Sequence, residues 1–298
     1  MRRKVDGVLL LDKPAGLTSN AALQKAKWLF QALKAGHTGT LDPFATGLLP
    51  LCLGEATKFS QFLLDADKTY LAEVLLGVRT STGDPEGDVL EQRPVDVTLA
   101  QVRAVLPRFV GEIMQTPPMH SALKKDGQPL YKLARRGIEI ERAARPVTVY
   151  GIDIVNLNQA SLILRVHCGK GLYVRTLAED IGGALGCGGS LKALRREAVG
   201  PFKIQEAITL ARLEEIDPAD RAVELDPVDC LVEGLERIDL DVESAWQIGH
   251  GQAIWRSGLN VGERLRLYDP AGHFLGVAEV DIEGKAAPRR LLATELAD

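Results

Sequence analysis

The stretch GHTGTLDPFATG, residues 36–47, is the densest cluster of conformationally special residues in this chain. It holds three glycines and one proline within twelve residues, which predicts a loop in dihedral angles that most residues avoid. Asp42 stands before Pro43, so its backbone is biased toward an extended conformation that directs its carboxylate. Loop chemistry alone favours an Asx turn or a helix cap for Asp42. No Gly-Lys-Ser/Thr follows, so the stretch is not a phosphate-binding P-loop.

The flanking residues predict a chain that mixes strands and helices. Gly7–Leu11 is a short apolar run of the kind that forms a buried strand, and Thr18 or Ser19 can cap the helix that follows. Residue content predicts strands at Thr69–Gly77, Val147–Asn156 and Leu162–Cys168, and a helix is expected at Arg175–Leu185 that ends at Gly186. Leu191–Val199 fits a helix or a strand. From about Trp246 onward, short apolar runs between glycine turns predict a small β-rich second domain.

Length and composition predict a globular protein of about two domains. The 298 residues are 46% hydrophobic and 26% charged, which argues against a disordered or fibrous chain. No apolar run approaches the roughly 18 residues of a membrane span, and none suits a signal peptide, so we expect a cytoplasmic protein with no membrane partner. The four cysteines include no Cys-x-x-Cys pair and the five histidines no His-Glu-x-x-His spacing. No metal site is therefore predicted.

The formal net charge of −4 hides an asymmetry along the chain. Residues 1–203 carry a net charge of +7, and residues 204–298 carry −11. The stretch 120–147 is basic, with a net charge of +4, whereas 204–243 is strongly acidic. Because the local field decides which partner a surface attracts, the acidic average does not exclude a polyanion such as RNA.

Several motifs in a fixed order extend the pattern around Asp42. They read GEATK at 54–58, DKTY at 67–70, PPM at 117–119, SALK at 121–124, GQPLYKLAR at 127–135, GKGLYVRT at 169–176, LRR at 194–196 and APRRL at 287–291. Together with GHTGTLDPFATGLLP at 36–50, this series resembles the TruB family of tRNA pseudouridine synthases. The resemblance covers nearly the whole chain except the acidic segment 204–243. One departure is His120, where the family pattern usually has tyrosine.

The resemblance implies an α+β fold with two domains. The catalytic domain, residues 1–235, would have the pseudouridine synthase fold, with a mixed, mostly antiparallel central sheet and flanking helices. The basic stretch 120–147 would be an insertion that clamps the RNA. Residues 240–298 would form a small β-rich, PUA-like RNA-binding domain. The sequence has no heptad or apolar stripe suited to pairing, so we expect a monomer.

The resemblance also implies a reaction, the isomerisation of one uridine in the T arm of tRNA, at the position conventionally numbered 55, to pseudouridine. No cofactor and no obligatory protein partner would be needed, and the T-arm stem-loop would be the partner. The target base would be flipped out of the loop. The catalytic residues would be Asp42, Tyr70 and Arg175. Asp42 could attack C1′, add to C6 or assist loss of the C2′ proton, with Arg175 as the cation that keeps it ionised.

Five further residues would bind substrate by resemblance. His37 would hold the flipped-out loop, Tyr173 and Leu194 would line the pocket, and Lys124 and Arg135 would contact phosphates. Without the resemblance, each has an ordinary interpretation as a core, loop or surface residue. Two other functions remain open: an RNA-binding or tRNA-folding module in which catalysis is secondary, and a guide-RNA-dependent relative. The basic tails expected of that last branch are absent from the sequence.

Overall fold

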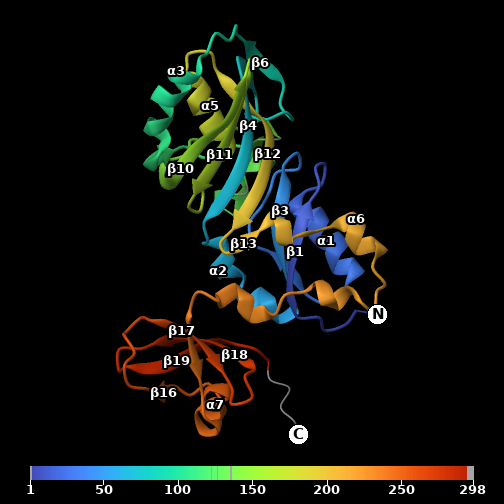
Figure 1. Ribbon diagram of the computed structural model, residues 1–298, viewed down its shortest axis with the longest axis vertical. Coiled ribbons are helices and arrows are strands. Elements are labelled where there is room, and N and C mark those ends of the chain that lie inside the picture. Colours follow the sequence, from blue (N-terminus) through green and yellow to red (C-terminus); the bar gives the residue numbers. More distant parts are fainter. Residues whose placement is uncertain (1, 122, 126, 135, 294–298) are drawn as a thin grey trace.

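The computed structural model describes residues 2–121, 123–125, 127–134 and 136–293, which fold into two β-sheets with seven helices among the described residues (Figure 1). The helices are α1 (Ser19–Leu29), α2 (Ser60–Leu64), α3 (Leu99–Val105), α4 (Leu130–Ala134), α5 (Val174–Ala184), α6 (Leu210–Glu215) and α7 (Val242–Gly249). Single 3-10 turns lie at Gly54–Lys58, Leu106–Phe109, Ile204–Glu206, Arg221–Glu224 and Val228–Val232.

The larger sheet has ten strands and carries the candidate site. Its strands are β1 (Gly7–Lys13), β2 (Ala35–His37), β3 (Thr46–Leu53), β4 (Lys68–Leu76), β7 (Gly111–Gln115), β10 (Arg145–Asn158), β11 (Ser161–Cys168), β12 (Gly189–Val199), β13 (Phe202–Lys203) and β14 (Ile208–Thr209). Along the main path the order is β14-β1-β3-β12-β4-β11-β10-β7, with β2 on β3 and β13 on β12. Only β1–β14 and β3–β12 pair in parallel among these described strands. The expected mixed, mostly antiparallel α+β fold is confirmed.

Local chemistry explains where these elements begin and end. The Thr18 hydroxyl accepts a hydrogen bond from Ala21 N at 3.0 Å, which caps α1. Gly186 adopts a positive φ of 83° just beyond α5, where a residue with a side chain would be strained. Along β11, buried and more exposed positions alternate, as a strand with one face on the core requires. The segment 191–199, which the sequence left open, is part of strand β12.

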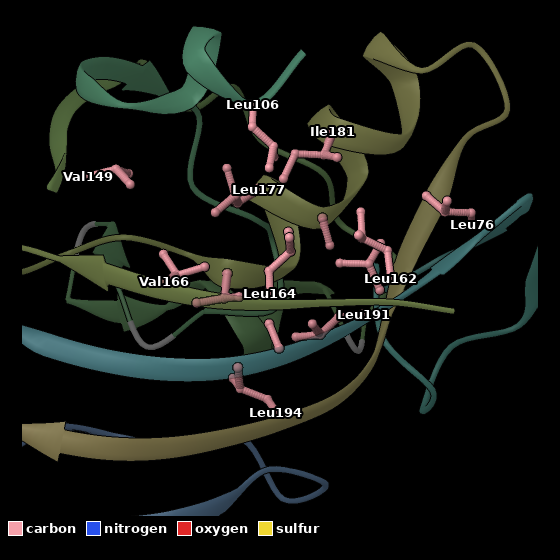
Figure 2. Close-up of a cluster of buried hydrophobic side chains, with 14 of the residues drawn as sticks. Leu76, Leu106, Val149, Leu162, Leu164, Val166, Leu177, Ile181, Leu191 and Leu194 are labelled. Carbon is pink, nitrogen blue, oxygen red and sulfur yellow. The ribbon is translucent and has the colours of Figure 1, made fainter. Parts of the chain in front are cut away.

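The main core lies between the large sheet and the helices α3 and α5 (Figure 2). Leu177 and Ile181 of α5 meet Leu164 of β11, and Leu191 and Leu194 of β12 extend the same cluster. A second cluster joins α1 to β1 and β3. Because side chains from both sides of the sheet are buried, its central strands are held in one register, and the loops at their ends are anchored.

A second sheet holds β15 (Glu236–Asp239), β16 (Ile254–Trp255), β17 (Arg264–Tyr268), β18 (Phe274–Val280) and β19 (Lys285–Leu291), in the order β15-β17-β18-β19-β16. Trp246 lies within α7, so the expectation of β structure from this residue onward is wrong for 246–249. The Asp241 carboxylate accepts from Ser244 N at 2.7 Å and starts that helix. The small sheet packs on the large domain, where the Phe59 and Phe274 rings lie 5.4 Å apart.

Two hairpins complete the described structure, β5 (Val78–Thr80) with β6 (Val89–Gln92), and β8 (Lys124–Lys125) with β9 (Gln128–Pro129). The first leads into the turn that approaches the candidate site, and the second lies in the basic insertion 120–147. None of the helices in the described ranges is long and apolar enough to span a membrane. The division into domains at 235 and 240 stays a prediction, and the second sheet begins at Glu236.

Candidate active site

An ion pair joins Asp42 to Arg175. Asp42 lies in the loop between β2 and β3, and Arg175 is the second residue of α5. Arg175 Nε lies 3.1 Å from Asp42 Oδ2, and Nη2 donates to Oδ1 at 3.4 Å. The Arg175 side chain is 5% exposed and that of Asp42 33%. The structure thus brings together two of the three residues expected to be catalytic, with the carboxylate still open to a substrate.

The Arg175 guanidinium has a second carboxylate partner that the sequence analysis missed. Nη1 lies 3.1 Å from Asp84 Oδ2, and the Asp84 side chain is 3% exposed. The guanidinium also donates to the Thr82 carbonyl at 3.3 Å and to the His120 carbonyl at 2.6 Å. Asp84 lies in the turn between the paired strands β5 and β6, and nothing local in the sequence indicates a partner 91 positions away.

The Asp42 carboxyl is held in an environment that opposes ionisation. Burial raises its pKa above the ordinary value, and the neighbouring Asp84 carboxylate raises it further. Arg175 is the strongest opposing influence, followed by Lys13. The net direction is upward, so the Asp42 carboxyl keeps its proton to a higher pH than a surface aspartate does.

The loop that carries Asp42 is tied to the scaffold on both sides. The Ser19 hydroxyl at the start of α1 accepts from Leu41 N at 2.8 Å and donates to Leu41 O at 3.0 Å. Lys13, fully buried at the end of β1, donates from Nζ to the Pro43 carbonyl at 3.3 Å and to the Leu17 carbonyl at 2.6 Å. Burial lowers the pKa of Lys13 to about 8. Lys13 is a second site residue that the sequence analysis did not single out.

Tyr70 and Leu194 lie on neighbouring strands beside this loop. Tyr70 is half-buried on β4, and burial raises the pKa of its hydroxyl. Leu194 is 8% exposed on β12 and belongs to the same apolar cluster as Leu41 of the Asp42 loop, with Tyr70 packed against it. The structure places both near the site, although Leu194 is also an ordinary core residue.

His37 and Tyr173 occupy defined positions at the edges of the site. His37 is half-buried on β2, and burial lowers the pKa of its imidazole. Its Nδ1 atom is buried without a hydrogen-bond partner among the described residues. Tyr173 precedes α5, where the Gln115 side chain bonds both its N–H, at 2.8 Å, and its carbonyl, at 3.1 Å. The Arg145 guanidinium lies 5.4 Å from the centre of the Tyr173 ring.

The two remaining predicted substrate-binding residues belong to the insertion 120–147. Lys124 is in β8, and the position of its side chain is outside the described structure. Arg135 lies outside the described residues. What connects the insertion to the site is the His120 carbonyl, which accepts from Arg175.

Comparison with known proteins covers nearly all of the chain. A model of the TruB family pseudouridylate synthase N-terminal domain matches residues 27–174, a tRNA pseudouridylate synthase B C-terminal domain matches 175–238, and a pseudouridine synthase II TruB C-terminal domain matches 237–292. These matches include the whole of the acidic segment 204–243, which the motifs had left unassigned.

Full-length relatives and solved structures agree with the family models. The tRNA pseudouridine synthase B of Thiobacillus denitrificans is 56% identical, over 98% of this chain and 98% of its own length. That of Methylobacillus flagellatus is 51% identical, over 98% and 97%. The solved structure titled "Crystal Structure of a Cbf5-Nop10-Gar1 Complex" contains a chain 27% identical to this one. The two superpose with a TM-score of 0.72 over 96% of this chain and 84% of that chain.

Proposed function

This chain belongs to the TruB family of pseudouridylate synthases, and on that premise we propose that it isomerises a uridine of tRNA to pseudouridine. The finer proposal is that the target lies in the T arm, at the position conventionally numbered 55. The observation that carries the proposal is the ion pair between Asp42, which a substrate can reach, and Arg175, which solvent hardly reaches.

The reaction rearranges one nucleotide. The bond between N1 and C1′ breaks, the uracil turns, and C5 bonds to C1′. C5 loses a proton and N1 carries one in the product, so the atoms balance without a cofactor. A base inside a folded loop cannot turn in place, so the enzyme must flip the nucleotide out, at a cost of a few kcal/mol. The pocket beside Asp42 must offset that cost.

Asp42 would act in its ionised form, whether it attacks C1′, adds to C6 or assists loss of the C2′ proton. Arg175 opposes the effect of burial on the Asp42 pKa and points the carboxylate through two contacts, at 3.1 and 3.4 Å. A guanidinium that makes two contacts with one carboxylate fixes the orientation of that carboxylate as well as balancing its charge. The buried Asp84, in turn, holds Arg175 in place.

The flipped uracil would lie between an aromatic and an aliphatic side chain. Tyr70 offers a ring on which the base can stack, an interaction worth about 1–3 kcal/mol per base. Leu194, on the adjacent strand, would supply an apolar contact. The half-buried His37 and the Tyr173 ring would hold the nucleotides next to the target.

The basic insertion would supply phosphate contacts with little dependence on sequence. The T-arm assignment would then come from the shape of the exposed loop, since proteins read RNA sequence mainly at unpaired bases. The Arg175 contact to the His120 carbonyl gives the insertion a route to the ion pair, so that closing on the RNA and aligning Asp42 would be coupled.

The test uses the purified chain, unmodified tRNA transcript and no added cofactor. Pseudouridine is mapped by chemical labelling and primer extension, with Asp42→Asn and a transcript carrying cytidine at the target position as controls. We expect one stop in the T loop for the wild-type chain and none in either control. Product at another position would refute the T-arm assignment.

The same assay separates the second candidate function, an RNA-binding or tRNA-folding module. Tight tRNA binding by the wild-type chain without pseudouridine would favour that function. The structural relative crystallised with other proteins defines a third outcome, in which activity appears only after partner proteins or a guide RNA are added.

A further inference from the structure

Arg196 is a fully buried arginine at the centre of the large sheet. It is 1% exposed and lies on β12, between two strands that carry parts of the site. Its backbone pairs with Gly47 of β3 on one side and with Tyr70 of β4 on the other. The Asp42 loop ends at β3, so Arg196 stands between that loop and Tyr70.

The guanidinium of Arg196 contacts the Asp42 loop near both of its ends. Nε donates to the Leu48 carbonyl at 2.7 Å, and Nη2 donates to the Gly39 carbonyl at 3.4 Å. Tyr70 lies directly opposite Arg196 on the neighbouring strand, and the positive charge of Arg196 lowers the pKa of the Tyr70 hydroxyl against the effect of burial. One rigid, planar group therefore contacts the loop before Asp42 and the strand after it, from a position opposite the tyrosine expected to stack on the base.

Two glycines make this arrangement possible. A Cβ on Gly47 would lie 2.3 Å from the Arg196 carbonyl oxygen, so only glycine lets the two strands approach this closely. A Cβ on Gly39 would lie 3.6 Å from Arg196 Nη1, an ordinary van der Waals distance, so at this position the backbone conformation rather than the space requires glycine. Both glycines also have positive φ, 112° at Gly39 and 105° at Gly47.

A buried cation is costly unless its environment compensates it. In the described part of the chain, Arg196 donates to two backbone carbonyls and has no carboxylate as a hydrogen-bond or ion-pair partner. A leucine or methionine could fill the same space without that cost. What the guanidinium adds is two bonds made at once, to the Leu48 and Gly39 carbonyls, from a position directly opposite Tyr70.

We propose that Arg196 is a positioning residue that fixes the Asp42 loop and the Tyr70 hydroxyl relative to each other, on the two sides of the bound base. It is sealed from solvent and does not touch the RNA. This inference rests on the function proposed above.

The first test is Arg196→Lys, which keeps the charge but cannot span the loop carbonyls and Tyr70 together. We expect kcat on tRNA to fall by about 100-fold, the loss that a misplacement of about 1 Å can cause. The Kd for tRNA should stay within about twofold, because a side chain that does not meet the RNA adds nothing to binding.

The matched control is Arg221→Lys. Arg221 is also buried, at 8% exposure, and donates to the Leu29 and Leu213 carbonyls at 2.8 and 3.1 Å, neither of which belongs to the Asp42 loop. The Arg221→Lys variant should lose thermal stability but keep the kcat of the wild-type chain. Equal losses of kcat in the two variants, at matched temperatures below their Tm values, would overturn the proposal.

A second readout does not depend on catalysis. In protein labelled with 13C at the ζ carbon of tyrosine, the Tyr70 resonance is assigned with Tyr70→Phe. We expect Arg196→Lys to shift it and Arg221→Lys to leave it in place. If Arg196→Lys does not fold, Gly39→Ala serves instead, because a side chain at the positive φ of Gly39 strains the backbone whose carbonyl accepts from Arg196. A Tyr70 resonance that does not move in the variant would refute the link between Arg196 and Tyr70. This readout does not depend on whether the wild-type chain makes pseudouridine, so the positioning role of Arg196 and the proposed function can be refuted independently.

Discussion

Asp84→Asn is the sharpest test of how the site is built. The substitution keeps the size and shape of the side chain but removes one of the two carboxylates that share Arg175. Both partners of the lost pair are buried, with side-chain exposures of 5% and 3% and a separation of 3.1 Å. Arg175 keeps Asp42 and the carbonyls of Thr82 and His120.

The expected loss of stability follows from that burial. Removing one partner of a buried ion pair costs about 3–5 kcal/mol, because the other charge stays buried. We expect the lower end, about 3 kcal/mol, since Arg175 retains other acceptors. For a chain of this size that corresponds to a fall in Tm of roughly 6–12 °C. Asp65→Asn, which breaks the exposed pair with Lys170, should cost less than about 1 kcal/mol.

The same substitution should move the pH dependence of activity in a known direction. The Asp84 carboxylate raises the pKa of Asp42, so its removal lowers that pKa. If ionised Asp42 is the active form, activity falls as the pH drops through the pKa of Asp42. The acid limb of the kcat profile should therefore move to lower pH in Asp84→Asn.

The assay combines thermal unfolding, monitored by circular dichroism, with single-turnover pseudouridine formation measured over the whole acid pH range in which each variant stays folded, so that the acid limb is covered. Single turnover isolates the chemical step from product release. An acid limb that moves to higher pH, or a Tm loss no larger than that of Asp65→Asn, would refute the account of Arg175 as a cation shared by two carboxylates.

Three further substitutions test other parts of the site. Tyr70→Phe keeps the stacking ring, so the tRNA Kd should be nearly unchanged while kcat falls; an unchanged kcat would show that the hydroxyl takes no part. Lys13→Met removes a cation that lowers the Asp42 pKa, so the acid limb should move to higher pH, opposite to Asp84→Asn. Burial lowers the pKa of Lys13 from 10.5 to about 8. Between these two pH values the folded chain binds fewer protons than the unfolded chain, so the free energy of unfolding rises with pH. Urea titrations of Lys13→Met should not show this rise. Gly47→Ala places a methyl group 2.3 Å from the backbone of β12 and should abolish folding or lower Tm sharply. Gly262→Ala, at a similar positive φ with nothing within 4 Å, should cost much less, and equal losses would contradict the steric argument.

The elements of the fold that depend on short-range chemistry were predictable from the sequence. The Thr18 cap, the stop at Gly186 and the alternation along β11 each depend on residues a few positions apart, and the structure confirms them. The segment 191–199 was ambiguous because a short apolar run satisfies both periodicities. In the folded chain this segment pairs with β3 and β4, and this pairing makes it a strand. Trp246 was misassigned because α7 is only eight residues long, too short for its period to stand out.

The sequence alone therefore determined the local conformations, the family resemblance and the candidates Asp42, Tyr70 and Arg175. Only the tertiary structure identified Asp84, Lys13 and Arg196 as parts of the same site. Arg196 meets the Leu48 carbonyl across 148 positions of the chain, a distance that no local pattern encodes. The physical reason is that the strength of a charge interaction depends on separation in space and on the exclusion of water. Both arise only when the sheet and its loops have packed together.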